Sequence, residues 1–185
     1  LRGKHYIVEN HFHYDKQIED ITKCVFLRGF WQSEKYFSAH RQAILKEFSF
    51  KNKLSDKNLK AAKKIRETTS ISVHVRRGDY ISNPGASKTF ASLDAEYYQK
   101  ALKKLNTDPI KTLLVFFSDD TDWVEKNIIN QLSNDYKHML VNHNIGSESY
   151  NDMRLMSLCS HNIIANSSFS WWGAWLNRTP GRKVI

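Results

Sequence analysis

Short apolar runs and amphipathic segments alternate in a regular order from residue 70 to the end of the chain. The runs that predict strands cover residues 71–76, 112–118, 138–141, 162–165 and 183–185. The segments with helical spacing that follow them lie near residues 94–105, 121–132, 150–159 and 168–177. This order is typical of a parallel sheet, because parallel strands need a crossover helix to connect them. The sequence therefore predicts a Rossmann-like α/β fold, a parallel sheet flanked by helices.

The first 69 residues have a different character. They contain two short strand-like runs, at residues 5–9 and 24–27, and a segment at 33–48 that predicts a helix. We therefore expect two parts. Residues 1–69 form a connecting segment with short strands and basic helices, and residues 70–185 form the α/β domain.

Positive charge is concentrated in one predicted helix before residue 70. The chain of 185 residues carries a formal net charge of +9, and six lysines fall between residues 51 and 64. Leu59, Ala62 and Ile65 recur there at helical spacing, with Ser55 as a cap. Such a helix either presents a solvated face or contacts an anionic partner, and an anionic membrane and nucleic acid both stay open. Nucleic acid is disfavoured because the lysines lie apart from the tryptophans.

Two cysteines, Cys24 and Cys159, lie in apolar surroundings without a Cys-x-x-Cys pattern. They predict buried free thiols in a reducing compartment such as the cytoplasm. No run approaches about 18 consecutive apolar residues, so no membrane-spanning helix is expected. The chain starts without methionine and ends on a strand-like run, so we expect it to be a piece of a longer protein.

Two adjacent arginines follow the first strand of the predicted sheet. Residues 71–75 alternate between apolar and polar types, and Arg76, Arg77, Gly78 and Asp79 come next. Arginine is almost never buried unpaired, and its planar guanidinium fits phosphate oxygens two at a time. Because ligands bind at the carboxyl ends of parallel strands, we expect an anion site here. The alternative is an exposed edge at which one arginine pairs with Asp79.

A group of acids follows the second strand of the predicted sheet, and includes Asp119, Asp120 and Asp122. The run 120–122 spells an Asp-x-Asp pattern that binds a divalent metal in some enzymes. We reject a metal here, because an aspartate at a helix start usually caps backbone amides. A carboxylate of Asp119 or Asp120 that faces the site can accept two hydrogen bonds from guanine, so we expect a purine contact.

The fourth predicted strand ends in small polar residues. Asn166 turns the chain, and Ser167, Ser168 and Phe169 open the next helix. A helix start directs backbone N–H groups and the positive end of the helix dipole to one point, which suits a diphosphate. Ordinary serine capping is the alternative, but it does not explain several hydroxyl groups in the same sheet as two arginines.

Several of these segments together resemble a known family. The matching pieces are His74–Asp79, Phe117–Asp120, Asp152–Trp175 and Trp31–Phe37, which span almost the whole chain. They resemble the carboxyl-terminal half of the α-1,2-fucosyltransferases of glycosyltransferase family 11, and more distantly the α-1,6- and protein O-fucosyltransferases. The resemblance implies the lobe of a GT-B-like fold that binds GDP-fucose. The glycine-rich start of the family, which belongs to the acceptor lobe, is absent here.

The resemblance also implies an activity and a role for each site residue. The family moves L-fucose from GDP-fucose to a galactose 2-hydroxyl of an oligosaccharide, with inversion and without a metal or other cofactor. Arg76 and Arg77 would stabilise the leaving diphosphate, and Asp79 would orient them, since an acid beside two arginines is a poor base. The implied contacts of GDP-fucose are His74, Asp119, Asp120, Asn166, Ser167, Ser168 and Phe169.

Partners and alternatives follow from the same comparison. We expect a bacterial cytoplasmic enzyme, peripheral to the inner membrane if the lysine-rich helix binds lipid, with a galactose-terminated oligosaccharide as acceptor and no nucleic acid. Two other functions stay open. One is a basic nucleic-acid-binding domain, and the other is a GDP-binding lobe without turnover of its own, because the amino-terminal lobe is missing.

Overall fold

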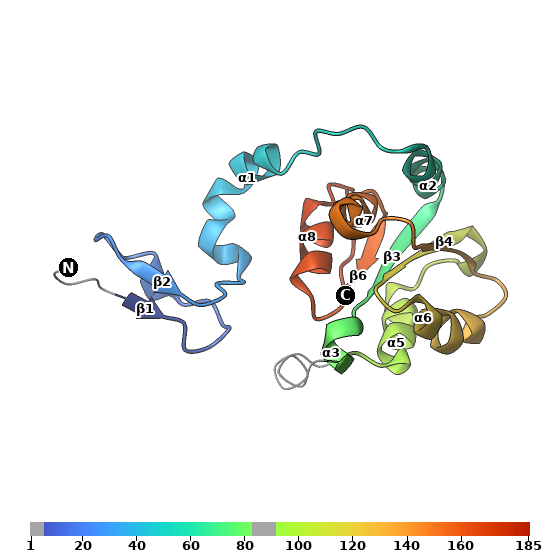
Figure 1. Ribbon diagram of the computed structural model, residues 1–185, viewed down its shortest axis with the longest axis horizontal. Helices are drawn as coiled ribbons and strands as arrows, with labels where there is room; N and C mark the ends of the chain where they lie inside the picture. Colours follow the sequence, from blue (N-terminus) through green and yellow to red (C-terminus); the bar gives the residue numbers. More distant parts are fainter. Residues whose placement is uncertain (1–5, 83–91) are drawn as a thin grey trace. The chain divides into compact units, whose positions relative to one another are not determined.

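The computed structural model describes residues 6–82 and 92–185 (Figure 1). Contacts within the chain separate it into two units, residues 1–49 and Phe50–Ile185. This boundary differs from the expected one at residues 69 and 70. The reason is that helix α2 (Asp56–Arg66) buries Ala61, Ala62 and Ile65 in the core of the second unit.

The first unit pairs two short strands in parallel, β1 (Tyr6–Val8) and β2 (Phe26–Arg28). Both overlap runs for which the sequence predicts strands. The carboxylate of Glu9 accepts hydrogen bonds from the backbone N–H groups of Phe30 at 2.6 Å and Trp31 at 3.2 Å. These bonds hold the segment that leaves β2 against the segment that leaves β1.

Helical turns complete the first unit. One is the 3-10 helix η1 (Lys16–Ile18). The helix predicted at 33–48 begins as a 3-10 helix, η2 (Glu34–His40), and continues as α1 (Arg41–Glu47). The hydroxyl of Ser33 caps its start.

Four parallel strands form the sheet of the second unit in the order β5-β4-β3-β6. Their bounds are β3 (Thr69–Val75), β4 (Thr112–Ser118), β5 (Lys137–Val141) and β6 (His161–Ile163). Beside β6, Val184 forms a parallel bridge with Asn162, where the sequence predicts a further strand. The prediction of a parallel α/β sheet is confirmed.

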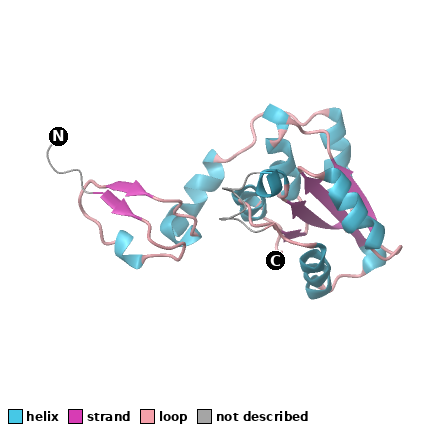
Figure 2. Ribbon diagram, turned by 60° about the horizontal axis from the view of Figure 1, so that its bottom comes forward, coloured by secondary structure: helices cyan, strands magenta, loops and turns pink. Residues whose placement is uncertain are grey.

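Helices lie on both faces of this sheet (Figure 2). Two of them cover one face, α5 (Ala95–Leu105) and α6 (Thr121–Asn127). Their apolar side chains join Ile71, Val73 and Phe116 in one buried core. Alternate residues of β3 point to opposite faces, so this core uses only half of the strand.

Three helices cover the other face, namely α2, α7 (Tyr150–Met156) and α8 (Ser168–Leu176). Their apolar side chains form the second core of the unit. Helices α7 and α8 approach so closely at Gly173 that a Cβ atom there would lie 3.0 Å from the side chain of Met156. This position therefore favours glycine.

Short helical turns connect these elements. They are α3 (Gly78–Ser82), η3 (Pro109–Lys111), η4 (Ile129–Gln131) and η5 (Gly146–Glu148). Over residues 6–82 and 92–185, no helix is both long enough and apolar enough to cross a bilayer.

The two cysteines differ in environment. Cys159 is a fully buried free thiol, as predicted, and burial raises its pKa to about 12. Cys24 is a free thiol as well, but it is exposed, so the prediction of burial is wrong there. It lies before the paired residues of β2, outside any packed face.

A buried asparagine joins the sheet to the helices on its second face. Asn162 on β6 is 1% exposed. Its Nδ2 donates to Ser72 Oγ at 2.6 Å and to the carbonyl of Met156 at 2.9 Å, while its Oδ1 accepts from Asn177 Nδ2 at 2.8 Å. Buried polar groups need such partners, so this side chain links two strands, α7 and the end of α8.

We expect Asn162→Ala to lower the free energy of unfolding by about 2–3 kcal/mol, because several buried polar groups lose their partner at once. Urea unfolding monitored by circular dichroism measures this loss. The matched control is Asn134→Ala at an exposed position, which should change the free energy of unfolding by less than about 0.5 kcal/mol. Equal stability of the two variants would contradict the structural role of Asn162.

Candidate functional site

The carboxyl ends of the four strands meet at one edge of the sheet, because all four strands are parallel. We call this the carboxyl edge. The polar segments that the sequence predicts as the site all follow these strand ends (Figure 1). They are residues 76–79 after β3, 119–122 after β4 and 166–169 after β6.

Asp119 fixes the turn that follows β3. Val75 and Ser118 are partners in the parallel register, so the next residues of the two strands lie side by side. The Oδ1 atom of Asp119 accepts a hydrogen bond from the backbone N–H of Arg77 at 2.9 Å, and Oδ2 accepts one from Gly78 at 3.1 Å. This carboxylate therefore satisfies two backbone donors at the start of α3.

The same carboxylate pairs with Arg76. Its Oδ2 atom lies 3.0 Å from Arg76 Nη1, and both side chains are partly exposed. A Cβ atom at Gly78 would lie 2.8 Å from Asp119 Oδ2. The close approach of Asp119 to the turn therefore favours glycine at this position.

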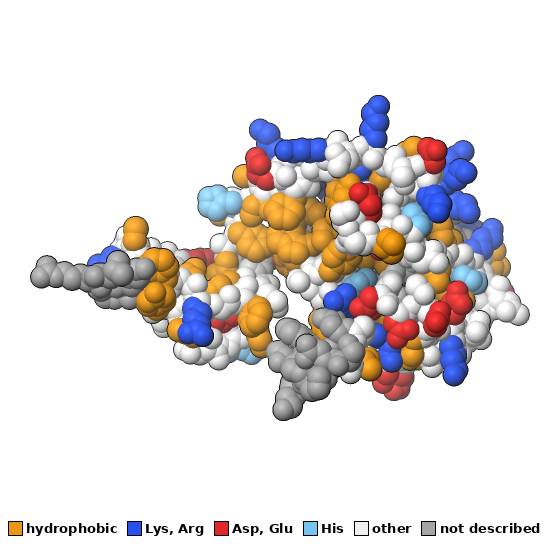
Figure 3. Space-filling view, in the orientation of Figure 1, with side chains coloured by type: hydrophobic (Ala, Val, Ile, Leu, Met, Phe, Trp, Pro, Cys, Tyr) orange, Lys and Arg blue, Asp and Glu red, His pale blue; other side chains and the backbone are white. Residues whose placement is uncertain are grey.

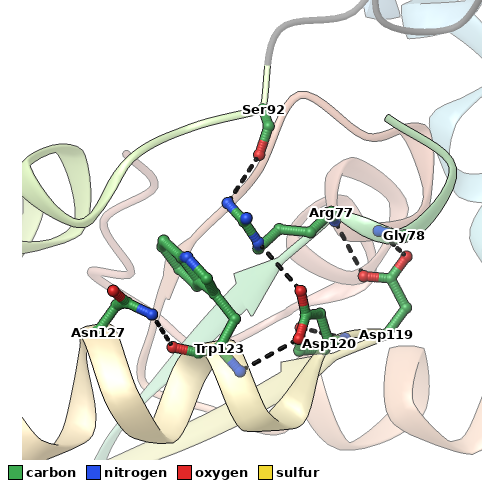
Figure 4. A network of polar contacts seen from close by, with 8 residues as sticks. Arg77, Gly78, Ser92, Asp119, Asp120, Trp123 and Asn127 are labelled. Atoms are coloured by element: carbon green, nitrogen blue, oxygen red, sulfur yellow. Dashed lines mark hydrogen bonds and ion pairs between the residues drawn. The ribbon is translucent and has the colours of Figure 1, made fainter. Parts of the chain in front are cut away.

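The guanidinium of Arg77 is held on one edge and over one face (Figure 4). Its Nε donates to Asp120 Oδ2 at 3.2 Å, and its Nη1 donates to Ser92 Oγ at 3.4 Å. The guanidinium carbon lies 3.9 Å from the centroid of the Trp123 ring, which is cation–π stacking distance. In the described part of the chain, Nη2 has no acceptor. Arg77 is thus oriented with donors left for an anionic ligand.

Asp120 performs two tasks at once. Its Oδ2 binds Arg77, and its Oδ1 accepts the backbone N–H of Trp123 at 3.1 Å, which caps α6. The prediction that the aspartate of the Asp-x-Asp pattern caps a helix is confirmed. Asp122, the other acid of the pattern, is exposed in the first turn. In the part of the chain that the structure describes, no three His, Cys, Asp or Glu side chains are grouped to hold a metal.

His74 is buried at the end of β3, on the face that α7 and α8 cover. It is 6% exposed, and its ring centroid lies 5.6 Å from that of Phe169. Burial lowers its pKa to about 4, and the charge of Arg76 acts in the same direction while Asp119 opposes it. Its Nδ1 is buried without a hydrogen-bond partner among the described residues. Unsatisfied groups of this kind are rare, and each needs an explanation, of which a functional role is one.

Ser167 begins α8 at the carboxyl edge. Its Oγ accepts the backbone N–H of Phe169 at 3.3 Å, as a helix cap does. Ser170 locks the same turn, because its Oγ accepts the N–H of Ala165 at 3.2 Å and donates to the carbonyl of Ser167 at 3.2 Å. The serines therefore divide between a cap, a buried brace and the exposed Ser168.

Tyr80 connects the segments that follow β3 and β6. Its hydroxyl donates to the backbone carbonyl of Asn166 at 2.7 Å. The Asn166 side chain is exposed, whereas Phe169 is half-buried against His74. The structure thus places the predicted site residues along one edge. The side chain of Asp79 lies outside the described residues.

A polar cluster to which the sequence assigns no role lies after β5. Asn144 Nδ2 donates to Asp152 Oδ1 at 2.7 Å, and Asn144 Oδ1 accepts from Asn58 Nδ2 at 2.7 Å. His143 Nε2 lies 2.9 Å from Asn58 Oδ1. Burial raises the pKa of Asp152 to about 6, against the opposing effect of its bond to Asn144. Asp152 lies in the first turn of α7, one of the helices that cover the face of the sheet on which His74 lies.

Two signals in the sequence point to these missed residues. Asn58 is the one polar residue on the inward face of an otherwise apolar helix stripe, which also holds Ala61, Ala62 and Ile65. Trp123 stands three residues after Asp120, in the first helical turn. Neither signal identifies its partner, because the contacts join residues far apart in the chain.

Comparisons with known proteins cover nearly the whole chain. The sequence model described as glycosyl transferase family 11 matches residues 4–185. The chain is 37% identical to the O-antigen biosynthesis glycosyltransferase WbnK of Escherichia coli, over 88% of this chain and 53% of the relative. It is 41% identical to an alpha-1,2-colitosyltransferase of Escherichia coli, over 88% of this chain and 55% of the relative. The chain thus spans about half the length of these curated relatives.

More distant proteins match similar parts. The galactoside 2-alpha-L-fucosyltransferase SEC1 of Bos taurus is 28% identical, over 82% of this chain and 42% of that protein. Among solved structures, the fucosyltransferase NodZ from Bradyrhizobium is similar at 13% identity and a TM-score of 0.41, over 90% of this chain and 65% of that one.

We expect His74 to make the folded protein less stable in mild acid. Its pKa rises from about 4 to its ordinary 6.5 on unfolding, so between these values the unfolded chain binds a proton that the folded chain does not. The free energy of unfolding therefore falls as the pH drops from 6.5 toward 4. Urea unfolding across this pH range should show that the free energy of unfolding falls less steeply toward acid pH in His74→Gln than in the wild type.

Asp152 has the opposite effect on the pH dependence of stability, because folding raises its pKa. The pH dependence of each variant is therefore compared with that of the wild type. The control is His13→Gln, at an exposed histidine, in which the free energy of unfolding should fall toward acid pH as it does in the wild type. An equal fall of the free energy of unfolding toward acid pH in His74→Gln and in the wild type would contradict a buried, neutral His74.

Proposed function

The chain belongs to glycosyl transferase family 11, and from that premise we propose that it is the lobe that binds GDP-fucose in a metal-independent α-1,2-fucosyltransferase. The complete enzyme would transfer L-fucose to the 2-hydroxyl of galactose in an oligosaccharide, with inversion. Because the chain spans about half of its curated relatives, the acceptor site is assigned to the rest of the protein.

The observation that carries this proposal is the oriented guanidinium of Arg77. Asp120 holds its Nε and Trp123 stacks on its face, so the free donors keep one direction. The start of α8 follows β6, the strand next to β3 at the same edge. A guanidinium and a helix start together form a site for a diphosphate.

The chemistry follows from the charge that develops during the reaction. The bond between the fucose anomeric carbon and the β-phosphate oxygen breaks, and its electron pair stays on the diphosphate. Arg77, with Arg76, would stabilise that negative charge, and the helix dipole of α8 would add to it. The acceptor hydroxyl attacks the opposite side of the sugar, which inverts the anomeric centre. We assign its base to no described residue.

For the purine we propose His74 and Asp152. Asp119 and Asp120 already bind both arginines and three backbone N–H groups, so a purine would compete with those bonds. Asp152 has one oxygen, Oδ2, without a partner among the described residues, and the bond from Asn144 orients its carboxyl group. A carboxylate can accept the N1 and N2 protons of guanine together, which adenine cannot offer.

The names of the relatives point to two sugars, fucose and colitose. We propose fucose as the donor sugar. The free thiols of Cys24 and Cys159 fit a reducing compartment, so we propose the bacterial cytoplasm as the location.

We expect GDP to bind at least about tenfold more tightly than ADP or UDP, because the guanine contacts are charge-assisted hydrogen bonds. EDTA should leave this affinity unchanged. The affinity should fall as the pH drops through about 6, where Asp152 takes up a proton and loses its acceptor role. Isothermal titration calorimetry measures all three effects.

Asp152→Asn should remove both the preference for GDP and the pH dependence. The control is Asp122→Asn, which neutralises an exposed carboxylate of α6 and should change neither. Equal binding of ADP, or a requirement for Mn²⁺ or Mg²⁺, would contradict the proposed purine and diphosphate contacts. Strong binding of a random DNA duplex with no nucleotide preference would favour the nucleic-acid alternative.

We expect Arg77→Lys to lower kcat/KM of the complete enzyme by a factor that corresponds to about 2–4 kcal/mol of lost transition-state stabilisation. Lysine keeps the charge but loses the planar donor pair. Trp123→Leu should cost less, about tenfold, because Arg77 stays charged and loses only its stacking partner. The control Arg66→Lys lies at the opposite edge of the sheet and should retain normal turnover. Near-normal turnover of Arg77→Lys would mean that Arg77 supplies only positive potential.

A further inference from the structure

A hollow lies at the edge of the sheet opposite the site. It has a volume of about 1020 Å³ and lies where α2 ends and where β3, β4 and β5 begin. Four of its lining residues are cationic, and we call them the basic edge: Lys64, Arg66, Lys111 and Lys137. In Figure 3, Lys and Arg side chains gather on the side of the view where α2 and the starts of these strands lie.

The positive charge of the basic edge is mostly unpaired with carboxylates among the described residues. Lys64, Arg66 and Lys137 are exposed, and no described carboxylate pairs with them. Lys111 lies 3.7 Å from Asp108, with its side chain 80% exposed. Glu67 is the one carboxylate among the lining residues, and it already lies 3.8 Å from Lys63. An anionic partner would therefore meet several cations at once.

Two large aliphatic side chains are exposed near these cations, Ile110 in the lining of the hollow and Leu59 nearer the start of α2. Leu59 is 52% exposed on the outer side of α2, and Ile110 is 69% exposed beside Lys111. On α2, Leu59 shares its stripe with Lys63 and Arg66, at the spacing that places residues on one side of a helix. The surface thus combines cations with apolar groups that water does not favour.

We propose that the basic edge, with Leu59 and Ile110, docks onto an anionic lipid bilayer. A bilayer accommodates both features, because its phosphates attract the cations and its interface takes up aliphatic side chains. A soluble polyanion would leave Leu59 and Ile110 in water. Docking at the amino ends of the strands leaves the carboxyl edge, with Arg77, free for its ligands.

The test is co-sedimentation of the protein with vesicles made of phosphatidylcholine and phosphatidylglycerol in equal parts. Binding should be strong at low salt, weaken at high salt, and be absent with pure phosphatidylcholine. A variant with Lys64→Glu, Arg66→Glu, Lys111→Glu and Lys137→Glu should bind at least about fiftyfold more weakly, because each cation near such a surface contributes about fivefold. A second variant, Leu59→Ser with Ile110→Ser, changes no charge and should bind several-fold more weakly.

The matched control reverses four cations elsewhere, on α5 and α6, with Lys100→Glu, Lys103→Glu, Lys104→Glu and Lys126→Glu. Its net charge equals that of the first variant, so retained binding would assign the effect to the basic edge. Circular dichroism checks that each variant is folded. Equal loss in the control, or unchanged binding in both test variants, would overturn the proposal. Loss of binding to a DNA duplex without loss of vesicle binding would assign the surface to nucleic acid and overturn it as well.

Discussion

Two ion pairs across neighbouring strands determine the geometry of the carboxyl edge. Because Val75 and Ser118 are register partners, Arg76 and Arg77 leave β3 beside Asp119 and Asp120, which leave β4. Without these carboxylates, two adjacent arginines would repel each other and adopt many rotamers. With them, one guanidinium is fixed by Asp120 and Trp123, and the backbone turn is fixed by Asp119. The proposed diphosphate site depends on this arrangement.

The order of strands and helices was accessible from the sequence because it rests on local periodicity. The strand at 112–118 has the predicted bounds, since its continuous apolar run is buried on both faces of the sheet. Ser55 caps α2 as its residue type predicts. The unit boundary was not accessible. The lysines of α2 suggest a solvated helix, whereas its packing depends on Ala61, Ala62 and Ile65 contacting a sheet that begins later in the chain.

The site was predicted as a set of strand ends, and its internal contacts were not. Residue types indicate that arginines and acids meet at one edge, but they do not indicate which acid binds which arginine. Asp119 and Asp120 were expected at the purine, which stays a prediction, and the structure shows that they orient the arginines and that Asp120 caps α6. Asp152, which we propose for the purine, was not among the predicted residues because its environment comes from Asn144 and Asn58, which belong to other elements. Only tertiary packing raises its pKa.

The most direct test of this account is a crystal structure of the complete protein with GDP. The account predicts the β-phosphate within hydrogen-bonding distance of the Arg77 guanidinium and the first turn of α8, with Asp120 still bound to Arg77 Nε. It also predicts the guanine beside His74 and Asp152. A diphosphate bound elsewhere, or an Arg77 side chain that leaves Asp120 and Trp123 and points away from the nucleotide, would contradict it.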